Sequence, residues 1–155
     1  MKCRHLTDSY TAFTLVELLT VVVLTGILAA VTIPQFVDHS DAVEQTAVFT
    51  SMKNIASSMI LFKVNNGDYP ADRNPAQCPA GFADYTQLDW VNEQPLGGQW
   101  DWDKGVFGFT AGISVYMPDK ETSYMQEMDR RFDDGNLNTG SFRARSQGYI
   151  YIIEP

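Results

Sequence analysis

The longest apolar run in the chain reads FTLVELLTVVVLTGILAAVTIPQF and extends from Phe13 to Phe36. Its 24 residues include one charged residue, Glu17. As a helix that rises about 1.5 Å per residue, the run spans roughly 36 Å, which is enough to cross a hydrocarbon layer of about 30 Å. It therefore predicts a transmembrane helix over residues 13–36, with an acidic residue near its start.

A polar leader of twelve residues precedes this run and carries Lys2 and Arg4. Basic residues that flank a membrane helix stay on the cytoplasmic side, so we expect the chain from Asp38 onward to be exported. A secretory signal has a shorter apolar region, of about 7–15 residues, followed by a small-residue cleavage site. An uncleaved signal anchor is the alternative interpretation, although an anchor needs neither Phe13 nor Glu17.

The segment TAFTLVELL, from Thr11 to Leu19, resembles the prepilin cleavage and methylation motif of type IV pilins and type II secretion pseudopilins. The resemblance implies that prepilin peptidase cuts between Ala12 and Phe13 and then methylates the new amino group of Phe13. It also implies that Glu17, the fifth residue of the processed chain, promotes assembly. Ala12 stands where the family usually has glycine, and alanine is small enough for a peptidase pocket.

The resemblance is close through Pro34 and looser to Pro70. It implies an α+β, pilin-like fold, in which a long N-terminal α-helix packs against a small antiparallel β-sheet with a short extra helix. Pro34 removes one backbone donor and should kink the helix. The expected parts are a prepilin leader peptide (1–12), a transmembrane and assembly helix (13–36), a helical spine (37–66) and a periplasmic globular head (67–155).

The resemblance also implies a location and a set of partners. The chain is expected to cross the bacterial inner membrane once, with a cytoplasmic N-terminus and a periplasmic head, and then to enter an extracytoplasmic filament. The implied partners are prepilin peptidase, other pilin-like subunits in a homo- or hetero-oligomeric filament, and the inner-membrane assembly platform.

We interpret the sequence as a filament-forming pseudopilin subunit of a type II protein secretion system. The Tyr69-Pro70 pair after the spine, the compact length and the lack of a C-terminal cysteine pair favour this interpretation. A minor pilin of a type IV pilus or related filament is the alternative, and a periplasmic binding domain on an uncleaved signal anchor is the third. The sequence does not separate a major from a tip subunit, and it does not identify a cargo.

An apolar stripe continues the helix beyond the membrane run, at spacings of four, three, four and three residues. Its members are Val48, Met52, Ile55, Met59 and Phe62. This period predicts one buried helical face. Asn65-Asn66-Gly67 is a strong helix stop, so the helix should end near Asn65 with its stripe in the core of the head.

The remainder of the chain predicts short strands and helices. We expect strands over residues 99–103, 106–109, 112–116, 140–145 and 149–153. We expect helices over residues 83–90 and from Asp119, as the N-cap or a first-turn acid, to Gly135. The last strand is apolar enough to lie in the centre of the sheet. Trp100 and Trp102 alternate onto one face, where they form either core or a carbohydrate platform, and we favour core.

Composition excludes several classes of function. The formal net charge is −8, which disfavours nucleic-acid binding because contacts with phosphate need clustered lysine and arginine. His39 is the only histidine outside the leader, and no catalytic or zinc-binding spacing appears, so we do not expect an enzyme. Cys78 is alone after the leader and is interpreted as an ordinary loop or core thiol.

Oxygen-bearing residues surround Gly135, namely Asp129, Asp133, Asp134, Asn136 and Asn138. Such loops can hold calcium, and some major pseudopilins bind calcium in a late loop. The group lacks a recognisable ligand spacing, and Asp-Gly-Asn is also ordinary turn chemistry. We expect no obligatory cofactor and keep calcium as the one metal to be tested.

Overall fold

The computed structural model describes residues 13–92 and 94–155, without the side chains of residues 31–39. The predicted leader, including Ala12, lies outside the described residues. The chain divides into two compact units, Met1–Asp41 and Ala42–Pro155, and each unit is described by itself.

Helix α1 (Leu15–Asn66) is the first element. It ends as predicted, because Gly67 has a left-handed φ of 87° and its N–H donates to the Lys63 carbonyl at 2.8 Å. The helix continues through residue 34, but the side chains around Pro34 lie outside the described part, so the kink stays a prediction. No helix in the described residues has the length and apolarity needed to cross a membrane, and the span over residues 13–36 also stays a prediction.

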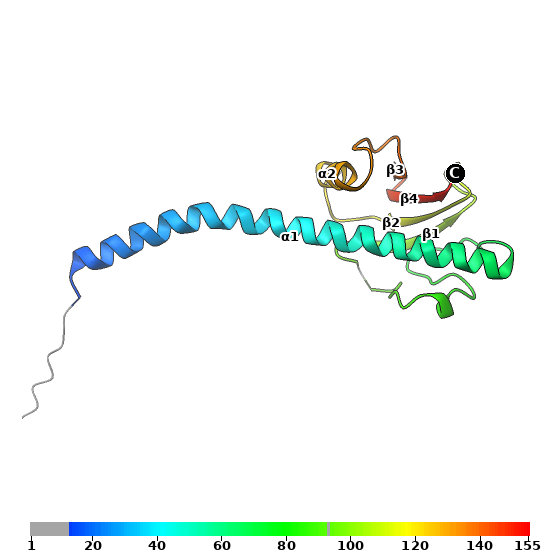
Figure 1. The fold of residues 1–155 in the computed structure, drawn as a ribbon, viewed down its shortest axis with the longest axis horizontal. Coiled ribbons are helices and arrows are strands. Elements are labelled where there is room, and N and C mark those ends of the chain that lie inside the picture. The colour runs from blue at the N-terminus through cyan, green and yellow to red at the C-terminus, as the bar shows by residue number, and fades with distance from the viewer. Residues whose placement is uncertain (1–12, 93) are drawn as a thin grey trace, which may run out of the picture. The chain divides into compact units, whose positions relative to one another are not determined.

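The head contains a four-stranded antiparallel sheet in the order β1-β2-β4-β3 (Figure 1). Its strands are β1 (Gln99–Lys104), β2 (Ala111–Tyr116), β3 (Phe142–Arg145) and β4 (Gly148–Glu154). The apolar closing strand β4 lies inside the sheet, as predicted. Helix α2 (Thr122–Phe132) connects β2 to β3. The α+β class with a long N-terminal helix, a small antiparallel sheet and a short extra helix is confirmed.

The strand predicted over residues 106–109 is wrong. Lys104 pairs directly with Ala111 in the ladder, so β1 returns as β2 and the residues between them form a loop. Gly105, Phe107 and Gly108 take left-handed φ values of 70°, 53° and 82°, which an extended strand does not contain.

Two predicted helix boundaries also need correction. The helix predicted over residues 83–90 is only a single 3-10 turn, η1 (Ala83–Tyr85), because Thr86 is extended with φ −142° and ψ 148°. The N-cap position of α2 is occupied by Glu121 rather than Asp119. Glutamate is not among the residues preferred at an N-cap, so the sequence did not mark this start, and Glu121 makes no side-chain capping bond.

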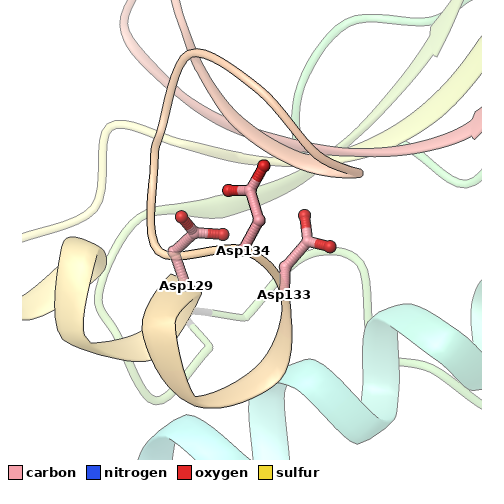
Figure 2. A group of neighbouring side chains, drawn as sticks. All are labelled: Asp129, Asp133 and Asp134. Carbon is pink, nitrogen blue, oxygen red and sulfur yellow. The ribbon is translucent and has the colours of Figure 1, made fainter.

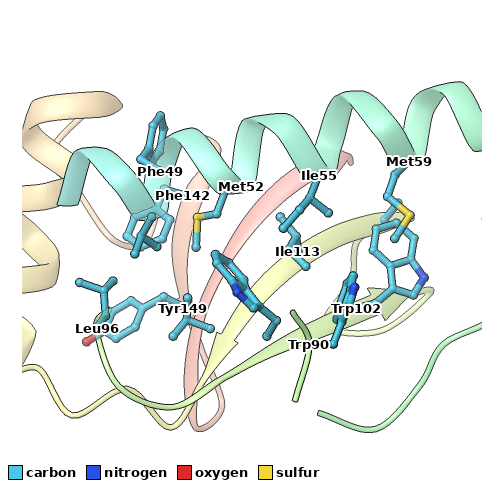
Figure 3. Close-up of a cluster of buried hydrophobic side chains, with 14 of the residues drawn as sticks. Phe49, Met52, Ile55, Met59, Trp90, Leu96, Trp102, Ile113, Phe142 and Tyr149 are labelled. Atoms are coloured by element: carbon cyan, nitrogen blue, oxygen red, sulfur yellow. The ribbon is translucent and has the colours of Figure 1, made fainter. Parts of the chain in front are cut away.

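The core of the head lies between the stripe of α1 and one face of the sheet (Figure 3). All the predicted stripe residues are buried, and Met52 and Met59 are completely enclosed. Trp100 and Trp102 are buried with them, and the Trp102 indole N–H donates to the Pro70 carbonyl at 3.0 Å. The interpretation of the two tryptophans as core is therefore confirmed.

Candidate functional site

The start of α1 is closed by a reciprocal set of hydrogen bonds between Thr14 and Glu17. The Thr14 backbone N–H and hydroxyl donate to Glu17 Oε2 at 2.9 and 2.7 Å, and the Glu17 backbone N–H donates to Thr14 Oγ1 at 3.2 Å. This is a capping box, in which two otherwise unsatisfied helix N–H groups find side-chain acceptors. Within the described residues these bonds engage Oε2 and leave Glu17 Oε1 for a further donor.

The residues around this cap present apolar side chains outward. Phe13 is 73% exposed. Each of the following side chains exposes more than half of its surface: Leu15, Val16, Leu18, Leu19, Val21, Val22, Val23, Leu24, Ile27 and Leu28. An apolar surface of this extent indicates contact with lipid or with another protein. The first site is therefore an apolar helix surface with one acidic group, Glu17, at its beginning.

A second candidate site is an acidic group at the end of α2. Asp129 belongs to α2, and Asp133 and Asp134 follow it in the loop toward β3 (Figure 2). Each of the three can supply a carboxylate oxygen so that the three oxygens lie within 4.8 Å of one another. Asp129 is fully buried, and neither of its carboxylate oxygens has a hydrogen-bond partner. A buried carboxylate without a donor needs a proton or a cation to compensate its charge.

The loop after α2 is built on the other two carboxylates. Asp133 Oδ2 accepts hydrogen bonds from the backbone N–H groups of Ser141 and Phe142. Asp134 accepts from the Asn136 N–H at 2.8 Å and from the Thr139 hydroxyl at 2.6 Å. A Cβ atom on Gly140 would collide with Asp133 Oδ2, so the loop can approach this carboxylate only with glycine there.

The pKa values of Asp129 and Asp134 are shifted in opposite directions. Burial, together with the charges of Asp134 and Asp133, raises the pKa of Asp129 to about 6, against the opposing effect of the Gly135 backbone N–H. The Thr139 hydroxyl and the Asn136 N–H lower the pKa of Asp134. At neutral pH the group therefore carries several negative charges with one buried, uncompensated member, and a hard cation such as Ca²⁺ fits carboxylate oxygens of this kind.

The structure brings the three predicted acidic calcium residues together, and Asn136 is joined to them through the bond from its N–H to Asp134. The N–H and side-chain amide of Asn138 donate to Asn136 Oδ1 at 3.2 and 3.3 Å, so this amide oxygen is used within the turn. Cys78 is half-buried, and burial raises the pKa of its thiol, as expected for an unreactive cysteine.

Sequence reasoning missed the capping role of Thr14, although the spacing of threonine and glutamate in a capping box is a recognised local signal. It also missed a buried ion pair between Asp101 and Arg145 on the sheet. No local signal could have found that pair, because the two residues are 44 positions apart.

Comparisons with known proteins point to one group of relatives. The chain is 39% identical over 59 residues to type II secretion system core protein G of Pseudomonas aeruginosa, covering 38% of this chain and 42% of that protein. It is 29% identical over 70 residues to the protein of the same name from Klebsiella michiganensis, covering 45% and 49%. For the Vibrio cholerae protein the identity is 32% over 60 residues, covering 39% and 41%.

These matches confirm the resemblance to type II secretion pseudopilins. The chain is similar to core protein G. It spans less than half the length of each of these relatives. No protein-family model and no solved structure matches the chain.

Proposed function

We propose that this chain is a filament-forming pseudopilin subunit of a type II protein secretion system, processed and N-methylated by prepilin peptidase. The observation that carries the proposal is the similarity to core protein G. The exposed apolar start of α1, with a single acidic residue, supports it. Those relatives are named as components of a secretion system, which fits a structural subunit rather than an enzyme.

In this proposal the membrane run of residues 13–36 anchors the chain in the inner membrane before assembly. The leader stays in the cytoplasm and the head lies in the periplasm, because the basic residues precede the run. The other partners would be further pilin-like subunits and an inner-membrane assembly platform.

In this proposal Glu17 favours assembly by pairing with a neighbouring copy. A carboxylate inside a membrane helix costs about 2.5–3.5 kcal/mol on insertion scales. Cleavage before Phe13 creates an amino group, and a positively charged amine of a neighbouring copy could pair with Glu17 Oε1 while Thr14 holds Oε2. This pairing would recover part of the cost and fix the axial offset between neighbours.

Mass spectrometry of the native protein tests the processing step. The expected N-terminal residue is Phe13 carrying one additional methyl group. A native protein that still begins at Met1 would contradict processing and would favour the uncleaved anchor.

The substitution Glu17→Gln tests the pairing. It removes the charge and keeps the shape, so the variant should insert into membranes normally but should enter filaments at least tenfold less efficiently than the wild type. Glu127→Gln is a matched control, because Glu127 lies on the surface of α2 in an exposed pair with Arg130, which contributes little. Normal filament incorporation of Glu17→Gln would refute the pairing.

We also propose that the acidic group at the end of α2 binds Ca²⁺. The buried Asp129 carboxylate without hydrogen-bond partners favours this second role. Asp129, Asp133 and Asp134 would hold the ion, and a bound cation would compensate the buried charge and stiffen the loop that leads to β3.

Thermal unfolding with Ca²⁺ or with a chelator tests the calcium proposal. Calcium at about one hundred times its dissociation constant should stabilise the protein by about 2.7 kcal/mol. Asp129→Asn should abolish this response, whereas Asp84→Asn, at an exposed position in η1, should retain it. A wild-type unfolding temperature that is the same with Ca²⁺ and with chelator would remove the proposal.

A further inference from the structure

The face of the sheet that points away from α1 carries a buried charged cluster. Asp101 and Asp103 of β1 meet Arg145 of β3, and the three side chains are only 7%, 6% and 5% exposed. The Arg145 guanidinium donates from Nη2 to Asp101 Oδ2 at 2.6 Å, and its Nε lies 3.6 Å from Asp103 Oδ2. We refer to Asp101, Asp103 and Arg145 as the charged cluster.

Arg145 reaches this position by crossing the sheet from one edge strand to the other. The strand order places β4 and β2 between β3 and β1. On these strands, Gly148 pairs with Arg145, and Ser114 pairs with Asp101. The Ser114 hydroxyl also donates to Asp103 Oδ2. Small residues under the arginine therefore let one side chain join the two edges.

The loop between β1 and β2 covers the charged cluster. We call residues 105–110 the cover loop. The Phe107 ring centroid lies 4.8 Å from the Arg145 guanidinium carbon, and the Tyr116 ring lies 5.7 Å from the same atom. Phe109 makes a similar contact with Arg143 at 5.4 Å. These aromatic rings attract the cationic side chains.

The cover loop is held in a strained conformation. Phe107 has φ 53°, a left-handed value that is unfavourable for a bulky side chain, and its side chain is 45% exposed. The loop closes through its own backbone bonds and through two bonds from Thr110: its N–H donates to the Glu154 carbonyl at 3.0 Å, and its hydroxyl donates to the Pro155 oxygen at 2.8 Å. At the tip of the loop, the contact of Phe107 with Arg145 joins these bonds and the Phe109 contact in holding the loop against the sheet.

The charges beneath the loop do not balance. Two carboxylates face one guanidinium, and Asp101 Oδ1 and Arg145 Nε are buried without hydrogen-bond partners. Asp72, beside β1, adds a further negative charge near both carboxylates. Tyr116 of β2 is the titratable side chain on the next strand, and Arg143 of β3 lies against Phe109 of the cover loop. The cover loop itself contributes no charged residue. Burial of an uncompensated charge is costly, and binding one proton would neutralise the cluster.

We propose that the charged cluster is a proton-operated latch, which keeps the cover loop closed when one of the two carboxylates carries a proton and loosens the loop when that proton leaves. Loss of the proton would leave a net negative charge under Phe107, and water entering to solvate it would separate the loop from the sheet. The loop would thus respond to the pH of the surrounding medium.

The direction of the pH effect follows from the same burial. Desolvation and the Asp103 charge raise the pKa of Asp101 to about 6, against the opposing effect of Arg145. Burial also raises the pKa of Asp103. A carboxyl group whose pKa is raised in the closed form stabilises that form fully below its ordinary pKa, and this stabilisation is lost as pH rises through about 6.

Amide hydrogen exchange on the full-length chain in detergent measures the latch directly. Protection factors corrected for the intrinsic exchange rates should be compared at pH 5 and pH 7.5. If opening the loop gives Asp101 the pKa of a solvated aspartate, about 3.9, in place of about 6, protection of residues 105–110 should fall by up to about tenfold at the higher pH. Equal protection of the wild-type loop at both pH values would overturn the proposal without any variant.

A substitution identifies the group responsible. Asp101→Asn removes the titrating proton, so protection of the cover loop should become independent of pH. Asp84→Asn, at an exposed position in η1, should retain the tenfold fall. If Asp101→Asn folds and still shows the wild-type fall in protection, the proposal is wrong for this carboxylate. If Asp101→Asn does not fold, Asp103→Asn provides the same comparison, because it also leaves one carboxylate for one guanidinium.

Discussion

Residues 15–30 and residues 42–66 belong to the same helix, but they differ in the exposure of their apolar side chains. In the first segment Leu15 and Leu24 are 82% and 60% exposed, whereas in the second Met52 and Met59 are fully buried. The first segment is apolar on every side, and the second is apolar mainly on the stripe that faces the sheet. An amphipathic helix completes a core within its own chain, and a helix that is apolar all round needs a partner outside it.

We therefore expect residues 42–66 to contribute to the stability of the head, and residues 15–30 to contribute to assembly. The head carries its own core from α1, β1, β2, α2, β3 and β4, so its folding should be insensitive to changes in residues 15–30. The first segment contributes a surface and the Glu17 carboxylate, whose effect should appear only when lipid or another copy is present.

Met52→Ala should have a large effect on stability. The side chain is completely buried between α1 and the sheet, and its removal loses transfer free energy and leaves a cavity. The free energy of unfolding should fall by about 2–5 kcal/mol. Denaturant titration followed by tryptophan fluorescence reports this change, because Trp90, Trp100 and Trp102 all lie in the core.

Leu24→Ala is the control from the first segment. It also truncates a large apolar side chain of α1 to alanine, but this side chain is 60% exposed. Unfolding of the head should be unchanged within about 0.5 kcal/mol. A loss comparable with that of Met52→Ala would mean that residues 15–30 contribute to the core of the head, and the proposed separation would fail.

Periodicity made much of the head predictable from sequence. The stripe from Val48 to Phe62 and the alternation of Trp100 and Trp102 follow directly from the geometry of helices and strands, and both sets are buried. The central place of β4 followed from its apolar composition. These predictions succeeded because each rests on a repeat that is visible within a few residues.

The sequence-based predictions failed where the burial or conformation of a residue depends on residues far away in the sequence. Asp101 and Asp103 alternate with the tryptophans and should face water, yet both are buried because Arg145 reaches them across the sheet. Val106 to Phe109 looked like a strand, but left-handed residues and contacts with the arginines fold it into the cover loop. The acidic residues near Gly135 were visible in the sequence, whereas the complete burial of Asp129 was not.

Thr14→Val should have an intermediate effect that is confined to the first segment. The substitution keeps the shape of the side chain and removes the hydroxyl that accepts from the Glu17 N–H and donates to its carboxylate. Loss of an N-cap costs about 0.5–2 kcal/mol. Hydrogen exchange of residues 15–19 should accelerate by about tenfold, while exchange in the strands of the head stays unchanged.

Thr20→Val separates capping from a general effect of removing a hydroxyl. Thr20 donates to the Glu17 carbonyl from inside the helix at 2.9 Å, so its substitution leaves the capping box intact. Exchange of residues 15–19 should then stay near the wild-type rate. Equal acceleration by both substitutions would show that the capping box does not hold the start of α1.

Leu61→Ser should have the smallest effect, and it sharpens the comparison within the second segment. Leu61 is 53% exposed, although its neighbour Phe62 is 8% exposed and packs against Phe82 and Tyr85. If burial rather than position along α1 sets the contribution of each side chain, Leu61→Ser should change the free energy of unfolding by no more than about 0.5 kcal/mol. Phe62→Ala should then cost about 3–5 kcal/mol in the same titration. A large loss of unfolding free energy for Leu61→Ser would show instead that the exposed face of residues 42–66 is also needed for stability. Burial against the sheet would then not be the only difference between the two segments.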